Sequence, residues 1–226
     1  MGFLKGYENI ARAAQHIPGL PSEEVIEAFQ IDVLNLLSEA YQTIKTPEKF
    51  FEDPDETQIS VSLFDACYII NDKNQTKFWV VPEYHEMTDE IRSGKKKAIS
   101  AKRFDIYFGN WSTPERVEYG VEAKLLVEND FMGRKSKKLI EEYVGDKGMN
   151  KYISGTYRKR GCMVGYVIEG NISNVVDKIN NHIESVFDSS QKLLKEQIIM
   201  FNHKEVYKSS HNKLGYSLFH LMLDFN

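Results

Sequence analysis

The 226-residue sequence contains little that would indicate a disulfide-stabilised, zinc-binding or membrane-spanning protein. Its 2 cysteines, Cys67 and Cys162, lie in apolar segments, so we expect buried free thiols in a reducing compartment. The cysteines and histidines lack zinc-ligand spacing. No apolar run approaches the roughly 20 residues that a membrane span requires, and the first residues lack a signal peptide's apolar core. We therefore expect a cytoplasmic protein with no membrane contact.

Glycine and proline are scattered, and charge of either sign is not in large excess. No glycine-rich phosphate loop is present, so nothing supports an ATPase or another nucleotide-binding fold. No repeat or linker divides the chain, which predicts one domain over residues 1–226, with residues 1–20 as an N-terminal helical extension. The net charge of −4 does not fit a general nucleic-acid coat protein, although local basic segments can still bind phosphates.

Helix-like and strand-like segments are mixed along the chain. Apolar residues at helical spacing predict helices over 22–45, 139–153 and 173–200. Alternating or β-branched segments predict strands over 58–64, 77–81, 103–108, 119–127 and 162–168, with two more after residue 205. Together these elements indicate an α/β fold with a mixed central β-sheet flanked by helices.

The most informative stretch, residues 102–127, is predicted to form two strands joined by a turn. Three charged residues interrupt its apolar pattern: Asp105 in the first strand, and Glu122 and Lys124 in the second. Side chains two residues apart on a strand point the same way, so Glu122 and Lys124 share a face. If the strands pair as a hairpin, Asp105 comes close to both. The alternative is that Glu122 and Lys124 form a solvated face and Asp105 caps a turn.

Two carboxylates and one ammonium in a small site have a chemical use. Carboxylates on rigid strands form a hard oxygen site that suits Mg²⁺. A neighbouring lysine can orient or deprotonate an attacking water and stabilise charge that develops on a phosphate. The spacing therefore favours a site for phosphate chemistry.

Phe104-Asp105 followed by Glu122-Ala123-Lys124 resembles the motif of the PD-(D/E)XK nuclease superfamily, although phenylalanine stands where the motif has proline. The resemblance implies a restriction-endonuclease-like fold and divalent-metal-dependent cleavage of nucleic acid. Asp105 and Glu122, with the Ala123 carbonyl, would hold Mg²⁺ or Mn²⁺, and Lys124 would be the catalytic lysine.

In the resembled fold, a helix before the sheet often supplies a further acidic residue to the metal. Glu39 is the candidate for this role, with Asp32 and Glu27 as rivals. A solvated helix carboxylate is the alternative for each.

Basic residues flank the predicted hairpin. The group before it is a candidate contact for the phosphate backbone and comprises Lys95, Lys96, Lys97, Lys102 and Arg103. Lys151 and Tyr152, in the segment after it, resemble residues that nuclease subunits of bacterial anti-phage defence systems direct toward their site. A solvated loop and ordinary helix packing are the respective alternatives.

The predicted function is thus a metal-dependent nuclease, with DNA as the expected substrate, in restriction or anti-phage defence. The alternative is a non-catalytic nucleic-acid-binding or assembly subunit that keeps the fold. A homodimer and a partner protein of a defence system are further expectations from the resemblance.

Overall fold

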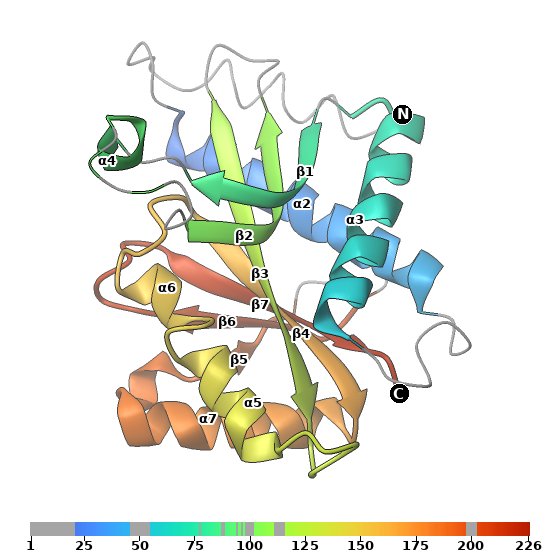
Figure 1. The fold of residues 1–226 in the computed structure, drawn as a ribbon, viewed down its shortest axis with the longest axis vertical. Helices are drawn as coiled ribbons and strands as arrows, with labels where there is room; N and C mark the ends of the chain where they lie inside the picture. The colour runs from blue at the N-terminus through green and yellow to red at the C-terminus, as the bar shows by residue number, and fades with distance from the viewer. Residues whose placement is uncertain are drawn as a thin grey trace.

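A computed structural model describes residues 21–45, 55–76, 78–86, 89–93, 95, 97, 102–110, 116–197 and 203–226. Its centre is a seven-stranded sheet in the order β1-β2-β3-β4-β7-β6-β5 (Figure 1). The strands are β1 (Phe78–Glu86), β2 (Lys102–Asn110), β3 (Val117–Val127), β4 (Gly161–Glu169), β5 (Leu194–Lys195), β6 (Val206–Ser210) and β7 (Ser217–Asp224). The helices are α2 (Glu23–Ile44), α3 (Glu56–Lys73), α4 (Asp89–Arg92), α5 (Ser136–Val144), α6 (Asn150–Ile153) and α7 (Ile172–Val186), with a 3₁₀ turn, η3 (Ser189–Gln191).

The sheet is mixed. Strands β1, β2 and β3 pair antiparallel, β3, β4 and β7 run parallel, and β7, β6 and β5 pair antiparallel. Helices α2 and α3 lie on one side of it and α5, α6 and α7 on the other (Figure 1). The predicted α/β class, with a mixed sheet flanked by helices, is confirmed.

Alternation along β3 divides its side chains between the two cores. Ala123 and Leu125 belong to the core that α2 and α3 cover. Leu126 belongs to the core on the α5–α7 side. Because side chains alternate along a strand, Glu122 and Lys124 lie on the same side as Leu126.

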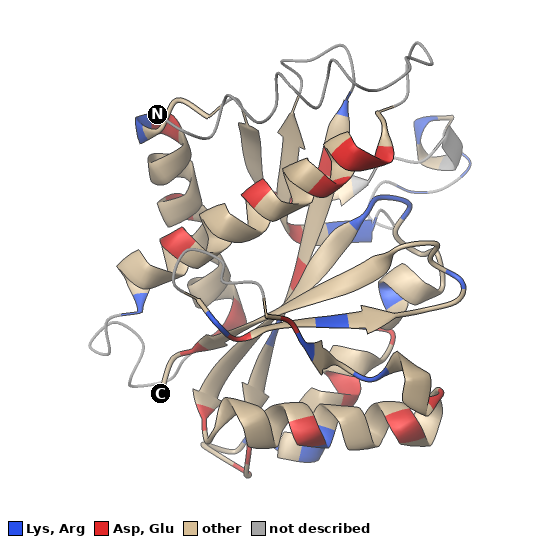
Figure 2. Ribbon diagram, turned by 180° about the vertical axis from the view of Figure 1, so that it is seen from behind, with Lys and Arg blue, Asp and Glu red and all other residues tan. Residues whose placement is uncertain are grey.

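Helix α2 follows the predicted segment closely. The Ser22 side chain accepts a hydrogen bond from the Val25 N–H at 3.4 Å, which caps the first turn. Its buried positions recur at helical spacing, from Val25 through Phe29 and Val33 to Ala40. The helix contains five carboxylates and no lysine or arginine, and Figure 2 shows them along its length.

The strand predicted over 58–64 is wrong, because residues 56–73 form helix α3. The buried residues Ile59, Leu63, Cys67 and Ile70 recur at intervals of three or four, which is a helical period. The seven-residue segment also alternates polar and apolar side chains, so a short window matched the strand pattern by coincidence. The helix places its first residue, Glu56, against the sheet.

Two predicted helices are shorter than expected. The segment 139–153 comprises two helices, α5 and α6, with a turn between them. The helix predicted over 173–200 ends at Val186, and η3 and β5 follow it. The break falls where Asp188 caps η3 by accepting a hydrogen bond from the Ser190 N–H at 2.8 Å. The strands predicted at 103–108, 119–127, 162–168 and after residue 205 are all present.

The predictions made from the few cysteines and from the lack of long apolar segments can also be compared with the structure. Cys67 and Cys162 are free and buried, as expected. Within the ranges described, no helix combines the length and apolar character that crossing a bilayer requires. The predicted helix at residues 1–20 lies outside the described residues.

Candidate active site

The β2–β3 hairpin separates halfway along its length. The last pair of its ladder is Ile106 opposite Val121. Beyond that pair, β2 remains paired with β1, and β3 remains paired with β4. The next residues on the two strands are Asp105 and Glu122, so two predicted site residues lie where the strands part.

Carboxylates take the place of the missing strand partner. The Ala123 N–H donates to Asp105 Oδ2 at 2.7 Å, and the Leu125 N–H donates to Glu56 Oε2 at 3.1 Å. These two N–H groups lie two residues apart and therefore point to the same edge of β3. A buried N–H without an acceptor is costly, so the separation of the strands itself requires acceptors at this point. Asp105 and Glu56 supply them.

Glu122 is the most enclosed carboxylate of the site, with 2% of its surface exposed. Its Oε1 accepts hydrogen bonds from the ammonium groups of Lys151 at 2.7 Å and Lys124 at 2.9 Å. Its Oε2 accepts one from the Tyr157 hydroxyl at 2.5 Å. Three donors, from β3, α6 and the loop after α6, thus hold a single buried charge, which burial alone would disfavour.

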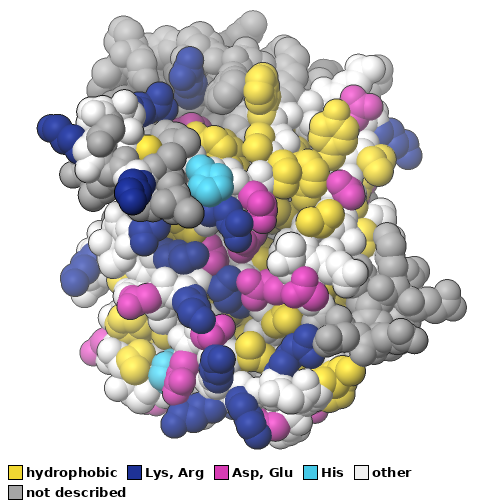
Figure 3. All heavy atoms as spheres, in the orientation of Figure 1, with side chains coloured by type: hydrophobic (Ala, Val, Ile, Leu, Met, Phe, Trp, Pro, Cys, Tyr) yellow, Lys and Arg dark blue, Asp and Glu magenta, His cyan; other side chains and the backbone are white. Residues whose placement is uncertain are grey.

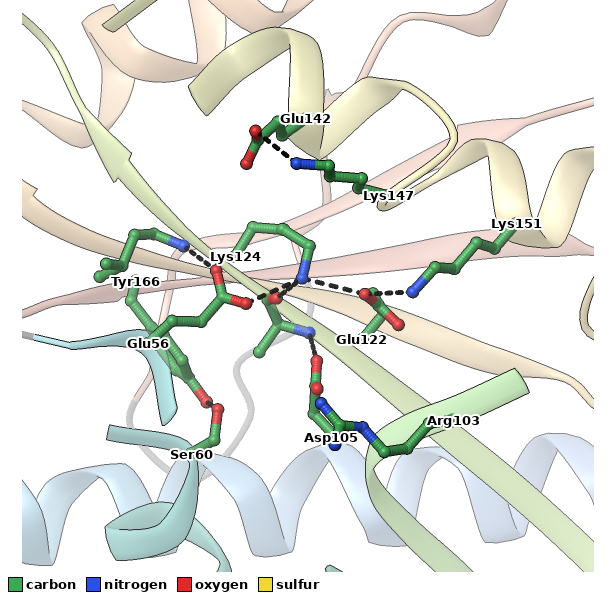
Figure 4. Close-up of polar contacts among 12 residues, drawn as sticks. Glu56, Ser60, Arg103, Asp105, Glu122, Lys124, Glu142, Lys147, Lys151 and Tyr166 are labelled. Carbon is green, nitrogen blue, oxygen red and sulfur yellow. Dashed lines mark hydrogen bonds and ion pairs between the residues drawn. The ribbon is translucent and has the colours of Figure 1, made fainter. Parts of the chain in front are cut away.

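Lys124 connects the carboxylates. Its Nζ lies 2.9 Å from both Glu56 Oε1 and Glu122 Oε1, and it also donates to the Ala123 carbonyl (Figure 4). Burial alone would lower the pKa of Lys124, but the charges of Glu122, Asp105 and Glu56 outweigh it and raise this pKa above its usual value. Lys124 is therefore a charged ammonium at neutral pH.

Asp105 shows the opposite balance. Burial, and then the negative charge of Glu122, raise the pKa of Asp105 to about 6. The Lys124 charge and the Ala123 N–H act in the other direction without cancelling this rise. A carboxyl group and an ammonium with shifted pKa values, close together in a cleft, are a frequent feature of active sites.

The cluster opens into a cleft of about 420 Å³. The described residues that line it are all charged, and Figure 3 shows side chains of both charges side by side near the centre of the face in view. The acidic ones are Glu56, Asp105, Glu122, Glu142 and Asp146, and the basic ones are Lys102, Arg103, Lys124, Lys147 and Lys151. A cleft of this composition suits a charged, hydrated ligand rather than an apolar small molecule.

A second hollow, of about 660 Å³, lies between the β3–α5 loop and α7. Its carboxylates have internal partners: Glu128 accepts from the Asn171 N–H at 2.8 Å, and Asp130 accepts from the Ser136 N–H at 3.0 Å. Backbone hydrogen bonds of this kind order the loops that carry them. We therefore assign the candidate site to the smaller cleft, where carboxylates and ammonium groups compete for one another.

The turn before α6 directs Lys151 into the cleft. A Cβ atom at Gly148 would lie 2.2 Å from the Tyr143 carbonyl oxygen, so only glycine fits this close approach. Three residues later, Lys151 reaches Glu122 and also donates to the Tyr157 hydroxyl at 3.1 Å. The Phe104 ring packs on Tyr157 with 3.9 Å between ring centroids, so the phenylalanine in the motif position supports a residue that contacts Glu122.

The structure brings together most of the predicted site. Asp105, Glu122, Lys124, Lys102 and Arg103 all line the cleft, as does Lys151. The Ala123 carbonyl is the acceptor for Lys124. Lys95 and Lys97 are exposed but do not line it, and Lys96 lies outside the described residues.

Two candidates are placed elsewhere. Tyr152 is fully buried, and its hydroxyl lies 3.0 Å from the Gly120 carbonyl oxygen and 3.2 Å from that of Cys162, so the prediction that it contacts nucleic acid is wrong. Glu39 does not line the cleft and lies near Cys67, whose pKa is raised by burial and, to a smaller extent, by the Glu39 charge. The helix carboxylate of the cleft is Glu56.

Glu56 was missed because the segment directly after it, residues 58–64, was predicted to be a strand, which hides the helix that begins at Glu56. A search at helical period would have found α3, and Asp55-Glu56 would then have been acidic residues at a helix N-terminus. Glu142 and Lys147, which form a 2.8 Å ion pair in the cleft, were missed as well. Nothing in their local sequence distinguishes this pair from an exposed one.

The donor set has the chemistry of a magnesium or manganese site. Asp105, Glu122 and Glu56 supply carboxylate oxygens, and Ala123 supplies a carbonyl oxygen, all hard ligands. In the part of the chain that the structure describes, no three His, Cys, Asp or Glu side chains already form a ready-made ligand group. The carboxylates are instead bridged by ammonium groups.

Comparisons with protein-family models, with curated proteins and with solved structures found no match.

Proposed function

We propose that the protein is a divalent-metal-dependent nuclease of the PD-(D/E)XK type that hydrolyses phosphodiester bonds, with DNA as the expected substrate. One observation carries the proposal: Asp105, Glu122 and Lys124, which the sequence motif singles out, line the same cleft at the point where two strands part. A role in restriction or anti-phage defence follows from the sequence resemblance alone.

In this proposal Asp105 and Glu122 hold Mg²⁺ or Mn²⁺ together with the Ala123 carbonyl, and Glu56 supplies a further carboxylate. Such an ion stabilises charge on the scissile phosphate and lowers the pKa of a water bound to it. The residues present fit it because every donor is an oxygen atom.

Lys124 acts in this proposal as a hydrogen-bond donor. Its raised pKa keeps the ammonium charged, which favours orienting the nucleophile and stabilising the phosphate over removing a proton. Glu56 accepts a hydrogen bond from Lys124 directly. The Tyr157 hydroxyl donates to Glu122 and so fixes the second carboxylate that contacts this lysine.

The substrate's phosphates would lie along the cationic side chains of the cleft. Lys102 and Arg103 come from β2, and Lys147 and Lys151 from the region of α6. The proposal assigns these side chains to phosphates and none of them to a base edge, so it expects binding to the backbone with little sequence preference.

The test is cleavage of supercoiled plasmid, single-stranded DNA and RNA by the full-length chain in Mg²⁺, Mn²⁺ or EDTA. Lys124→Ala is expected to abolish metal-dependent cleavage. Lys135→Ala, which removes an exposed lysine that pairs with Asp130 outside the cleft, is the matched control and should cleave normally. Divalent-dependent cleavage that survives in Glu122→Ala would refute the assignment.

A second candidate is a non-catalytic nucleic-acid-binding or assembly subunit with the same cleft. The observation that favours it is that both oxygens of Glu122 already have internal donors, so the cluster is complete as an ion-pair network. Nucleic-acid binding that is unchanged in EDTA, with no turnover at any metal concentration, would support this function.

A further inference from the structure

The two ammonium groups on Glu122 are held very differently. The Lys124 side chain is 10% exposed and keeps two other acceptors, Glu56 and the Ala123 carbonyl. The Lys151 side chain is 20% exposed, and among the described residues its hydrogen-bond partners are Glu122 and the Tyr157 hydroxyl. If Glu122 were to bind another cation, Lys124 would keep two acceptors, whereas Lys151 would lose its one carboxylate partner among the described residues and keep the Tyr157 hydroxyl.

A divalent cation and the Lys151 ammonium cannot both bind Glu122 Oε1 favourably. Like charges a few ångströms apart repel strongly where water is scarce, and Glu122 is 2% exposed. Glu122 Oε1 already carries two ammonium groups. An ion that takes this oxygen must therefore displace one of them. Lys124 has a second carboxylate, Glu56, whereas the other contacts of Lys151 are with the hydroxyl and the ring of Tyr157.

Once released from Glu122, the Lys151 ammonium can move into the cleft and contact a phosphate there. Lys151 projects from the four-residue helix α6 into the cleft, beside Lys102, Arg103 and Lys147, and Figure 4 shows its side chain approaching Glu122 from the side opposite Lys124. Its long unbranched stem can turn toward the cleft without moving the helix. A backbone phosphate there would be a new anionic partner.

We propose that Lys151 is an exchangeable internal counter-ion of Glu122. It neutralises the carboxylate while no divalent cation is bound, and it transfers to a phosphate of the nucleic acid when Mg²⁺ or Mn²⁺ takes Glu122. The inference rests on the proposed function and adds regulation to it. Since each ligand favours release of the same lysine, metal and nucleic acid bind with positive coupling, and each raises the affinity for the other.

A purely structural lysine would behave differently. If Lys151 only stabilised the fold, it would stay on Glu122 when a cation binds, and its access to solvent would not change. If it is a counter-ion that the metal displaces, its removal strengthens cation binding in the absence of nucleic acid, and metal binding exposes its ammonium group. The metal affinity and the solvent access of Lys151 therefore separate the two roles together, without any measurement of cleavage.

The first experiment measures Mn²⁺ binding alone to the full-length protein, by titration calorimetry and by the electron paramagnetic resonance signal of free Mn²⁺. Lys151→Met, which keeps the stem and removes the charge, is expected to bind Mn²⁺ at least about tenfold more tightly than the native chain. Lys151→Arg keeps the charge and should stay within about twofold of it. Lys147→Met removes a lysine that lines the same cleft but pairs with Glu142, and its affinity should also change less than about twofold.

The outcomes separate this inference from the proposed function. If Lys151→Met binds Mn²⁺ no more tightly than the native chain, while Glu122→Gln abolishes binding, the counter-ion role is wrong and the metal site stands. If neither the native chain nor Lys151→Met binds Mn²⁺, or if Glu122→Gln binds it normally, both proposals fail.

A second measurement needs no variant. Lysines of the native protein are labelled with an amine-reactive reagent, and the rate at each lysine is read by mass spectrometry. Addition of Mg²⁺ should increase labelling of Lys151 about threefold or more, while Lys135, an exposed lysine that does not line the cleft, serves as the internal reference. Addition of a DNA strand should then reverse the increase. Labelling of Lys151 that does not change with Mg²⁺ would overturn the inference.

Discussion

Two polar clusters lie on the side of the sheet that α5, α6 and α7 cover, and they differ in charge and in access to solvent. The first surrounds Glu122 and opens into the cleft. The second is sealed: His220 Nδ1 bonds the Tyr143 hydroxyl at 2.9 Å, and His220 Nε2 bonds the Ser209 hydroxyl at 2.8 Å. Ser209 also bonds His211 at 2.8 Å, and His211 reaches Gln191 at 2.7 Å.

The sealed cluster is neutral. Burial lowers the pKa of His220 to about 3 and that of His211 to about 4, so both rings are uncharged at neutral pH. Each of their ring nitrogens has one partner, and no group competes for another's acceptor. A network of this kind stabilises one arrangement of β6, β7 and α5.

The cleft cluster is charged, and several of its groups share the same hydrogen-bond partner. Lys124 is shared by two carboxylates and a carbonyl, and Glu122 by two ammonium groups and a hydroxyl. Burial of polar groups alone therefore does not mark a functional site. Exchangeable charges that reach solvent do, because a ligand can replace one internal partner with another.

The largest expected effect is on catalysis at Glu122. Glu122→Gln keeps the shape and removes the charge, so we expect cleavage to fall at least about 1,000-fold because the metal loses a charged ligand. Initial rates of plasmid cleavage at saturating Mg²⁺ measure the loss. A fall of less than about tenfold would show that Glu122 is not a metal ligand.

The second effect should be on stability alone. His220→Leu leaves the hydroxyls of Tyr143 and Ser209 each without one partner, and we expect a loss of about 1–3 kcal/mol in the free energy of unfolding. Urea denaturation measures it. Cleavage rates well below the unfolding midpoint should stay within about twofold of the native value, and a larger loss of activity would connect the sealed cluster to the cleft.

The pH dependence of stability follows from the same histidine. His220 has a lowered pKa in the folded state, so the unfolded chain binds more protons between pH 6.5 and about 3, and stability falls as pH falls through this window. Between pH 6.5 and 5 the loss should be about 1–2 kcal/mol. Urea denaturation of the native chain and of His220→Leu checks it: the variant should show a smaller slope, and equal slopes would contradict the assignment.

A smaller effect is expected at Tyr157. Tyr157→Phe keeps the ring against Phe104 and removes the hydroxyl from Glu122. Because Tyr157 positions Glu122 and touches no substrate in this proposal, we expect kcat to fall about tenfold with KM changed less than about twofold. Steady-state kinetics on a short DNA duplex measure the two constants. A change confined to KM would assign Tyr157 to substrate binding instead.

The smallest effect is expected at an exposed ion pair, which calibrates the others. Lys135 and Asp130 lie 2.8 Å apart with more than half of each side chain exposed. Lys135→Ala should shift the thermal unfolding midpoint by less than about 1 °C, since solvent and salt screen such pairs. Differential scanning fluorimetry is sufficient, and a shift of several degrees would show that surface charges matter more in this fold than the contrast between the clusters assumes.

Much of the fold was predictable wherever a pattern was long. The 22-residue helix α2 and the strands β3 and β4 have extended apolar periodicity, and each was predicted within a few residues. The segment 58–64 failed because seven residues match the strand and helix periods almost equally well. Packing against α2 decides between the two, since Ile59 and Leu63 are both fully buried in that core.

Some residues of the candidate site were likewise predictable from the sequence, and others were not. Asp105, Glu122 and Lys124 were predictable because strand alternation and a short connection bring them together. Glu56, Tyr157 and the role of Lys151 were not, since their partners come from separate elements of the fold. Tyr152 and Glu39 were plausible by residue type, and only their surroundings distinguish them from residues that reach the cleft.

By itself, the order of residues determined that Glu122 and Lys124 share one face of a strand and that Asp105 lies on its neighbour, because a strand alternates its side chains and a hairpin reverses the chain. The tertiary structure decided which carboxylate joins them. Glu56 lies 68 positions before Lys124, and it reaches the site because the separating strands leave the Leu125 N–H without a backbone acceptor, which the first turn of α3 provides.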